Sequence, residues 1–126
     1  MKNSHLSEII IPGKFESLNE YITQSRSSVY AGNNMKRRDQ NIICRYIPKG
    51  SKFTYIKVIF RYFEPNAKRD KDNISGYFHK IFFDALTQAK AIPNDGWNHV
   101  GDMEDHYYVD KKNPRIEVVI IDQASG

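Results

Sequence analysis

The chain has 126 residues, which suits one domain over 1–126, and its 40% hydrophobic and 13% aromatic content excludes a disordered tail. The single cysteine, Cys44, excludes an internal disulfide and is expected to be a buried or half-buried thiol. The formal charge of +4 is compatible with a nucleic-acid partner, and no apolar run approaches the roughly 20 residues of a membrane span, so we expect a soluble, cytoplasmic protein.

Hydrophobic periodicity and turn residues predict the secondary structure. In chain order we expect a strand at 7–11, helices at 17–26 and 29–46, a strand at 53–63, a helix at 73–90, and strands at 99–109 and 115–121. Ser17 with Glu20 should cap the first helix, and Asp72 should cap the third. The order β-α-α-β-α-β-β predicts an α+β fold in which the helices pack against one small mixed sheet.

Apolar residues in the second half of the chain mark surfaces that should be buried. In the third helix they are spaced to form one face, at Ile74, Phe78, Ile81, Phe82, Ala85 and Ala89. Two further groups, 118–121 and Tyr107–Tyr108, are either core or part of a dimer interface on edge strands, and core is the favoured interpretation.

Acidic and basic residues alternate in the segment KRDKDN, residues 68–73. Asp70 and Asp72 are two apart, so in an extended backbone their side chains point the same way. Asp95 follows the helix and joins them only if its loop folds back. Clustered carboxylates are typical ligands of Mg²⁺, with Mn²⁺ as a substitute. The alternative is an ordinary solvated turn whose acids cap the helix.

Basic residues around these acids are candidates for phosphate binding. Lys68, Arg69 and Lys71 are interleaved with the aspartates, as expected if carboxylates hold a metal and cations hold the same polyanion. Arg37 and Arg38, in the second predicted helix, either face solvent or contact phosphate as well.

One flank of the third helix carries Asn73, Lys80 and Asp84, at intervals of seven and four residues. Asn73 and Lys80 could therefore both face a site at the helix start. Alternatively, Lys80 and Asp84 form an exposed ion pair one turn apart. His79 is interpreted as an exposed or stacking residue and not as a general base.

Taken together, these motifs resemble the RusA family of Holliday junction resolvases, in its phage and prophage branch. The resemblance rests on the motif RDKDN at 69–73, Lys80 followed by DAL at 84–86, the loop NDGW at 94–97, the early segments IPG at 11–13 and SLN at 17–19, and the closing segment NPRIEV at 113–118. It covers most of the chain and is densest from Arg69 to Trp97.

The resemblance implies a homodimer that cuts four-way DNA junctions symmetrically with Mg²⁺. It assigns metal binding and catalysis to Asp70, Asp72 and Asp95, and a catalytic role to Lys80, while Asp84 matches a further recurring acid. The chain departs from the family's first-described members because Lys80 follows the motif's asparagine by seven residues instead of three. On a straight helix that adds roughly 6 Å.

The sequence therefore predicts a metal-dependent endodeoxyribonuclease of DNA recombination and repair, encoded by a phage or prophage and acting in the bacterial cytoplasm. An alternative is a non-catalytic module on the same fold that binds junctions or single strands by charge and stacking. A third possibility is a phage assembly protein without a nucleic-acid partner, which would show no salt-dependent DNA binding.

Overall fold

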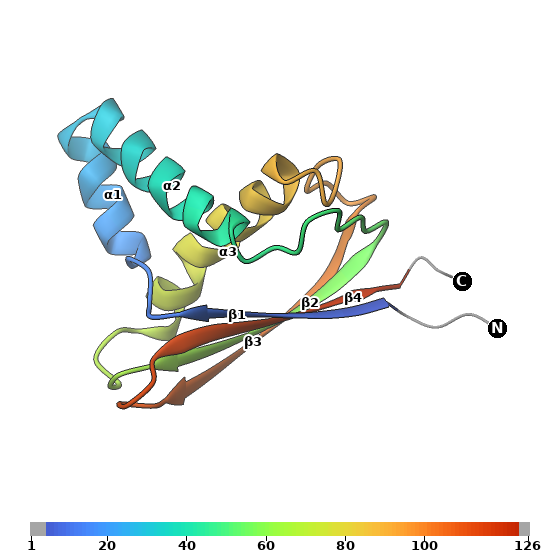
Figure 1. Ribbon diagram of the computed structural model, residues 1–126. Helices are drawn as coiled ribbons and strands as arrows, with labels where there is room; N and C mark the ends of the chain where they lie inside the picture. The colour runs from blue at the N-terminus through green and yellow to red at the C-terminus, as the bar shows by residue number, and fades with distance from the viewer. Residues whose placement is uncertain (1–4, 124–126) are drawn as a thin grey trace.

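The predicted order of helices and strands is observed in this computed structural model, which describes residues 5–123. The elements are β1 (His5–Pro12), α1 (Leu18–Ser27), α2 (Val29–Cys44), β2 (Ile56–Glu64), α3 (Lys71–Gln88), β3 (Val100–Val109) and β4 (Arg115–Asp122). The strands form one mixed sheet in the order β1-β4-β2-β3, and the helices cover one face of it (Figure 1). The predicted α+β class is therefore confirmed.

The connection from β2 through α3 to β3 sets the positions of the chain segments that matter for function. β4 pairs antiparallel with β1 and β2, whereas β2 and β3 run parallel. Two neighbouring parallel strands need a crossover, so α3 runs back along the sheet from the end of β2 to the start of β3. A hydrogen bond from the Phe53 amide to the Ala91 carbonyl, at 2.8 Å, holds the end of α3 near the start of β2.

Strict alternation places one side of β2 in the core. Phe60 and Tyr62 are fully buried beneath the helices. The alternate residues of the strand, such as Arg61 and Phe63, face the open side of the sheet. We expected this strand to begin at Phe53, but it begins at Ile56. The amides of Thr54 and Tyr55 donate to the carboxylate of Asp122, at 2.9 and 3.1 Å, so they leave the strand ladder.

The apolar face predicted for α3 is buried against the sheet. Five of its six residues lie in the core, whereas Ala89 is exposed at the helix end. The helix begins earlier than expected, with Asp70 at the N-cap, so the prediction that Asp72 caps it is wrong. Asp72 lies in the first turn instead.

α1 and α2 pack beside α3 through polar as well as apolar contacts. The capping box of α1 is confirmed, with reciprocal Ser17–Glu20 hydrogen bonds of 2.8 and 3.1 Å. Asp39 of α2, buried at 2% exposure, accepts a 2.7 Å hydrogen bond from the Tyr77 hydroxyl of α3. Cys44 is half-buried, as expected, and burial raises the pKa of its thiol.

β4 is an inner strand, which corrects the expectation that residues 118–121 could form an edge. Val118 and Ile120 are buried in the core, so the favoured interpretation of this segment is confirmed. Of the tyrosine pair, Tyr107 is half-buried and Tyr108 is exposed. Among residues 5–123, no helix is both long and apolar enough to cross a membrane.

The buried hydroxyl of Tyr62 predicts a loss of stability at alkaline pH. Burial, and then the Asp105 carboxylate, raise the pKa of Tyr62 above the value of about 10 expected in the unfolded chain. The unfolded state therefore binds fewer protons above pH 10, so this contribution is present below that pH and falls as pH rises. We expect the free energy of unfolding to fall by about 1.4 kcal/mol per pH unit more steeply in the wild type than in Tyr62→Phe.

Urea unfolding between pH 8 and about pH 11.5 measures this difference. Tyr30→Phe, which removes an exposed phenol on α2, is the matched control and should keep the wild-type slope. Equal slopes for Tyr62→Phe and the wild type would contradict the prediction.

Candidate functional site

A buried ion pair anchors the loop that carries the aspartates. β2 ends with Glu64 facing inward, at 5% exposure. Arg69 donates to both of its carboxylate oxygens, at 2.9 and 2.8 Å, and its third nitrogen donates to the Phe15 carbonyl at 2.8 Å. This bidentate hydrogen bonding is among the strongest interactions that arginine forms with a carboxylate. Arg69 therefore holds the loop to β2 and to the segment after β1, and it is not the free phosphate ligand that we expected.

Asp70 and Asp72 are left free by this anchoring. Asp70 occupies the N-cap of α3 without capping through its side chain, and Asp72 lies in the first turn. Both are exposed, and within residues 5–123 neither carboxylate has a hydrogen-bond or ion-pair partner. The positive end of the α3 dipole favours negative charge at both positions. Two carboxylates with free lone pairs are thus presented together at one helix start.

A cleft of about 660 Å³ opens at this end of the sheet. It is lined by Glu64, Asn66, Ala67, Arg69, Asp70, Lys71, Asp72, Ile74, Tyr107, Tyr108 and Val109. The Lys71 ammonium lies 5.5 Å from the centre of the Tyr107 ring, while Lys68 is exposed on the adjoining loop. The cleft therefore combines free carboxylates, the Lys71 ammonium and tyrosine residues, with a second lysine beside it.

Asp95 is not part of this cleft. It lies in the loop after α3 and lines a separate cleft with Tyr55, Trp97 and Gly101. The 18 residues of α3 span about 27 Å, and the two loops lie at its opposite ends (Figure 1). The structure thus brings together Asp70 and Asp72 but not Asp95. In the described part of the chain, no three His, Cys, Asp or Glu residues are grouped so that they could hold a metal ion.

The flank of α3 that carries Lys80 also differs from expectation. Lys80 is exposed nine residues into the helix, about 13 Å along its axis from Lys71, and does not line the cleft. Asp84 pairs with Lys36 of α2 at 2.9 Å, so the alternative interpretation, a Lys80–Asp84 pair, is wrong. Asn73 is half-buried, and its backbone N–H donates to the Asp70 carbonyl at 3.1 Å in the first turn.

A polar contact between α3 and β3 was not visible in the sequence. Asp105 accepts a 2.9 Å hydrogen bond from the Tyr62 hydroxyl, and the same oxygen lies 2.7 Å from the His79 Nε2. The centre of the His79 ring lies 4.7 Å from that of Phe60, with the planes inclined by 38°, so the half-buried ring contacts an aromatic neighbour without being exposed or stacked parallel to it. No local motif signals this contact, because its members come from β2, α3 and β3.

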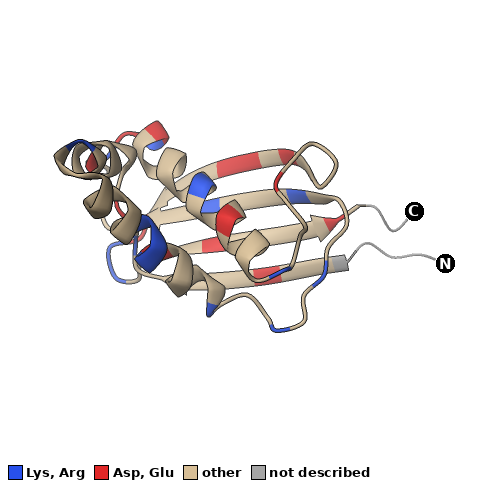
Figure 2. Ribbon diagram, turned by 90° about the horizontal axis from the view of Figure 1, so that it is seen from above, with Lys and Arg blue, Asp and Glu red and all other residues tan. Residues whose placement is uncertain are grey.

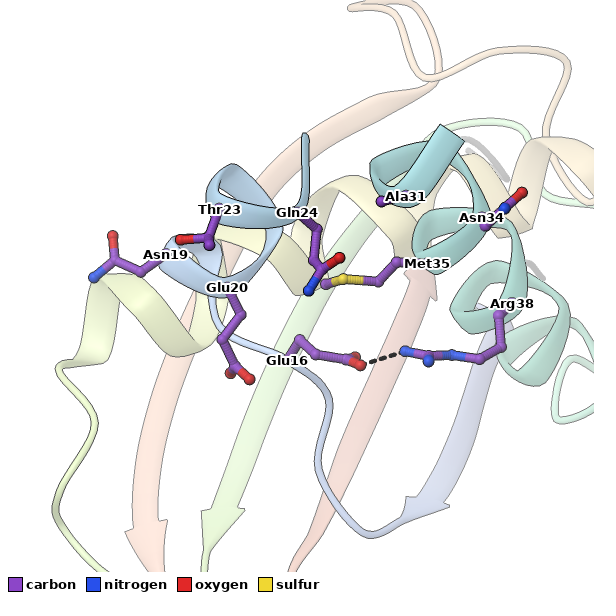
Figure 3. A pocket seen from close by; sticks show the side chains of 9 residues that line it. All are labelled: Glu16, Asn19, Glu20, Thr23, Gln24, Ala31, Asn34, Met35 and Arg38. Carbon is purple, nitrogen blue, oxygen red and sulfur yellow. Dashed lines mark hydrogen bonds and ion pairs between the residues drawn. The ribbon is translucent and has the colours of Figure 1, made fainter. Parts of the chain in front are cut away.

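The two arginines of α2 lie away from the cleft with the aspartates. Arg38 pairs with Glu16 and, at 3.0 Å, with Asp39, so its charge is already compensated. Its hydrogen bonds to these two carboxylates, Asp39 first, raise the pKa of Arg38. Figure 3 shows the Glu16–Arg38 pair across a separate cleft of about 600 Å³ between α1 and α2. Arg37 is exposed and remains the better candidate for phosphate contact.

Charge is spread and not gathered on one surface. Figure 2 shows segments of both signs interspersed over the helices and the sheet. Any preference for a polyanion must therefore come from local groups such as Lys68 and Lys71, and not from the formal charge of +4.

Comparison with known proteins adds no assignment: no protein-family model matches the chain, and no curated protein matches it. The geometry of the cleft and the motif that lines it are therefore the features that point to a function.

The Glu64–Arg69 pair predicts a strong asymmetry between single and double substitution. Arg69→Met leaves the buried Glu64 carboxylate unpaired and should lower the free energy of unfolding by about 3 kcal/mol or more. The double variant Arg69→Met with Glu64→Leu should recover much of that loss, because it removes both charges. Urea unfolding of the wild type and both variants at neutral pH measures these differences.

Lys68→Met is the matched control, since it removes an exposed cation next to Arg69 and should change stability by about 0.5 kcal/mol at most. A loss in Arg69→Met as small as that in Lys68→Met would show that the pair contributes little.

Proposed function

We propose that the protein is a Mg²⁺-dependent endodeoxyribonuclease of the RusA type that cuts four-way DNA junctions. The observation that carries the proposal is the pair of exposed, unpartnered carboxylates, Asp70 and Asp72, at the start of α3. They lie in a cleft with Lys71 and beside Lys68, so acids for a metal and cations for a DNA backbone occupy the same place. Mn²⁺ is the expected substitute metal.

The donor set fits a hard cation. Asp70 and Asp72 offer only oxygen, which Mg²⁺ prefers, and two protein carboxylates suffice when waters and phosphate oxygens complete the shell. When bound, Mg²⁺ supplies stabilisation of the charge that develops on a phosphodiester under attack. The chain's own residues orient the strand, with Lys68 and Lys71 holding phosphates next to the carboxylates.

Asp95 enters the proposal through a second copy of the chain. Because α3 separates it from Asp70 and Asp72 by about 27 Å, it joins their site only if a partner subunit supplies it. A homodimer also matches the two-fold symmetry of a four-way junction, which needs two equivalent sites for paired cuts. In this arrangement Lys71 lines the cleft of the aspartates within one subunit, and Lys80 acts only if a partner or the DNA reaches it.

A non-catalytic DNA-binding module is the second candidate. It is favoured because, within the described part of one chain, no third His, Cys, Asp or Glu is grouped with Asp70 and Asp72 so that the three could hold a metal ion. It predicts DNA binding that is independent of divalent metal, with no cutting in Mg²⁺ or Mn²⁺.

Asp72→Asn tests the nuclease proposal directly. Loss of one carboxylate should lower the cutting of a synthetic four-way junction by at least about 100-fold, because the metal loses a charged ligand. Junction binding measured in EDTA should remain, since the lysines are unchanged. Cleavage is followed on denaturing gels with Mg²⁺, with Mn²⁺ and with EDTA. The matched control is Glu8→Gln, which neutralises an exposed acid on β1 outside both the cleft with Asp72 and the cleft with Asp95.

Wild-type protein that binds junctions but leaves them intact in both metals would replace the nuclease by the binding module. An Asp72→Asn variant as active as the wild type would remove Asp72 from the site.

Mixed dimers test whether Asp95 acts across subunits. Asp72→Asn and Asp95→Asn should each be inactive alone. When the two variants are co-expressed in equal amounts, half of the dimers contain one copy of each and carry one intact site out of two. About a quarter of the wild-type number of active sites should therefore return. These dimers should nick one strand without the paired second cut. If Asp95 acted within its own chain, every site in the mixture would carry one substitution and no cutting would return.

A further inference from the structure

A row of flat side chains crosses the open face of the sheet at the end that carries the cleft. Phe63 of β2 lies in register between Arg115 of β4 and Tyr108 of β3. The Arg115 guanidinium carbon lies 3.8 Å from the centre of the Phe63 ring. On the other side, the Tyr108 ring is stacked on Phe63, with centroids 4.7 Å apart and planes inclined by 18°. The three groups form one continuous stack.

The stack ends at Tyr108 because β3 is the edge strand of the sheet. Tyr108 is 44% exposed, although it packs against Phe63 on one side. Within residues 5–123 no further strand lies beyond β3 to cover its outer side. A planar group could therefore extend the stack by one layer.

The charge at the inner end of the stack is already compensated. Arg115 donates to Glu117 at 2.7 Å and to Asp110 at 2.8 Å, and these hydrogen bonds, Glu117 first, raise the pKa of Arg115. The guanidinium thus stiffens the stack without offering free charge to a phosphate. At its open end the row exposes an aromatic surface, the ring of Tyr108, which suits a neutral flat ligand.

Tyr108 also lines the cleft that contains Asp70, Lys71 and Asp72. A nucleotide whose phosphate is held beside Lys71, over the Tyr107 ring, therefore lies at the β3 edge, where the next side chain, Tyr108, projects on the open side of the sheet. We propose that Tyr108, backed by Phe63 and Arg115, is a stacking site for an unpaired nucleobase of the bound DNA strand. This inference rests on the proposed binding of DNA at the cleft, and adds that bases as well as phosphates are contacted there.

Base stacking can be separated from charge by comparing two ligands with the same phosphates. The probes are a short fluorescent oligothymidylate and an abasic oligonucleotide of equal length, titrated in EDTA and followed by anisotropy. The wild type should bind the oligothymidylate about tenfold more tightly, as expected for one stacked base. Tyr108→Leu should bind both probes with similar Kd, whereas Tyr108→Phe and Tyr108→Trp, which keep a ring, should retain the preference.

Tyr30→Leu is the matched control, because Tyr30 is an 80% exposed tyrosine on α2 that lines neither the cleft with Asp70 nor the cleft with Asp95, so its loss should leave the preference unchanged. Loss of the preference in Tyr30→Leu but not in Tyr108→Leu would overturn the proposal. So would a Tyr108→Leu variant that keeps the preference but changes its oligomeric state in sedimentation, which would make this row an interface between copies.

The nuclease assay of the wild type is scored separately. A Tyr108-dependent base preference without cutting in Mg²⁺ or Mn²⁺ supports the stacking site and removes the nuclease. Cutting without that preference removes the stacking site alone. If neither probe binds and no junction is cut, both proposals are wrong.

Discussion

The parallel pairing of β2 with β3 is the constraint on which the rest of the structure depends. Parallel neighbours cannot be joined by a tight turn, so α3 must run the length of the sheet between them. Its apolar face then covers β2, and its two ends are held about 27 Å apart. The segment after β2 and the segment before β3 therefore lie at opposite ends of the domain.

This geometry decides which polar residues work together. The loop after β2 brings Asp70 and Asp72 to the cleft, and the parallel pairing brings the end of β3, with Tyr108, to the same place. The loop before β3 carries Asp95 away from them. A fold of this kind gathers two unpaired acids, two lysines and a tyrosine at one end of a single chain, where the remaining acid, Glu64, is already paired with Arg69.

Buried polar pairs give the same end of the domain its rigidity. Glu64 and Arg69 join the end of β2 to the loop before α3, and the arginine reaches the Phe15 carbonyl as well. Burying either charge without its partner would cost free energy, so the favoured arrangement of the loop is the one that keeps Glu64 and Arg69 paired. Asp70 and Asp72 are presented to solvent because Arg69, next to them in sequence, is committed to this contact.

The sequence by itself determined the fold class, the element order, the capping box at Ser17 and most of the buried face of α3. These follow from local periodicity and capping, which depend on residues only a few positions apart. Only the tertiary structure decided that Arg69 is a structural residue, that Asp84 pairs with Lys36, that β4 is an inner strand and that Asp95 lies far from Asp70. Each of these depends on contacts between segments distant in the chain, where the partner is chosen by strand order and helix packing and leaves no local signal.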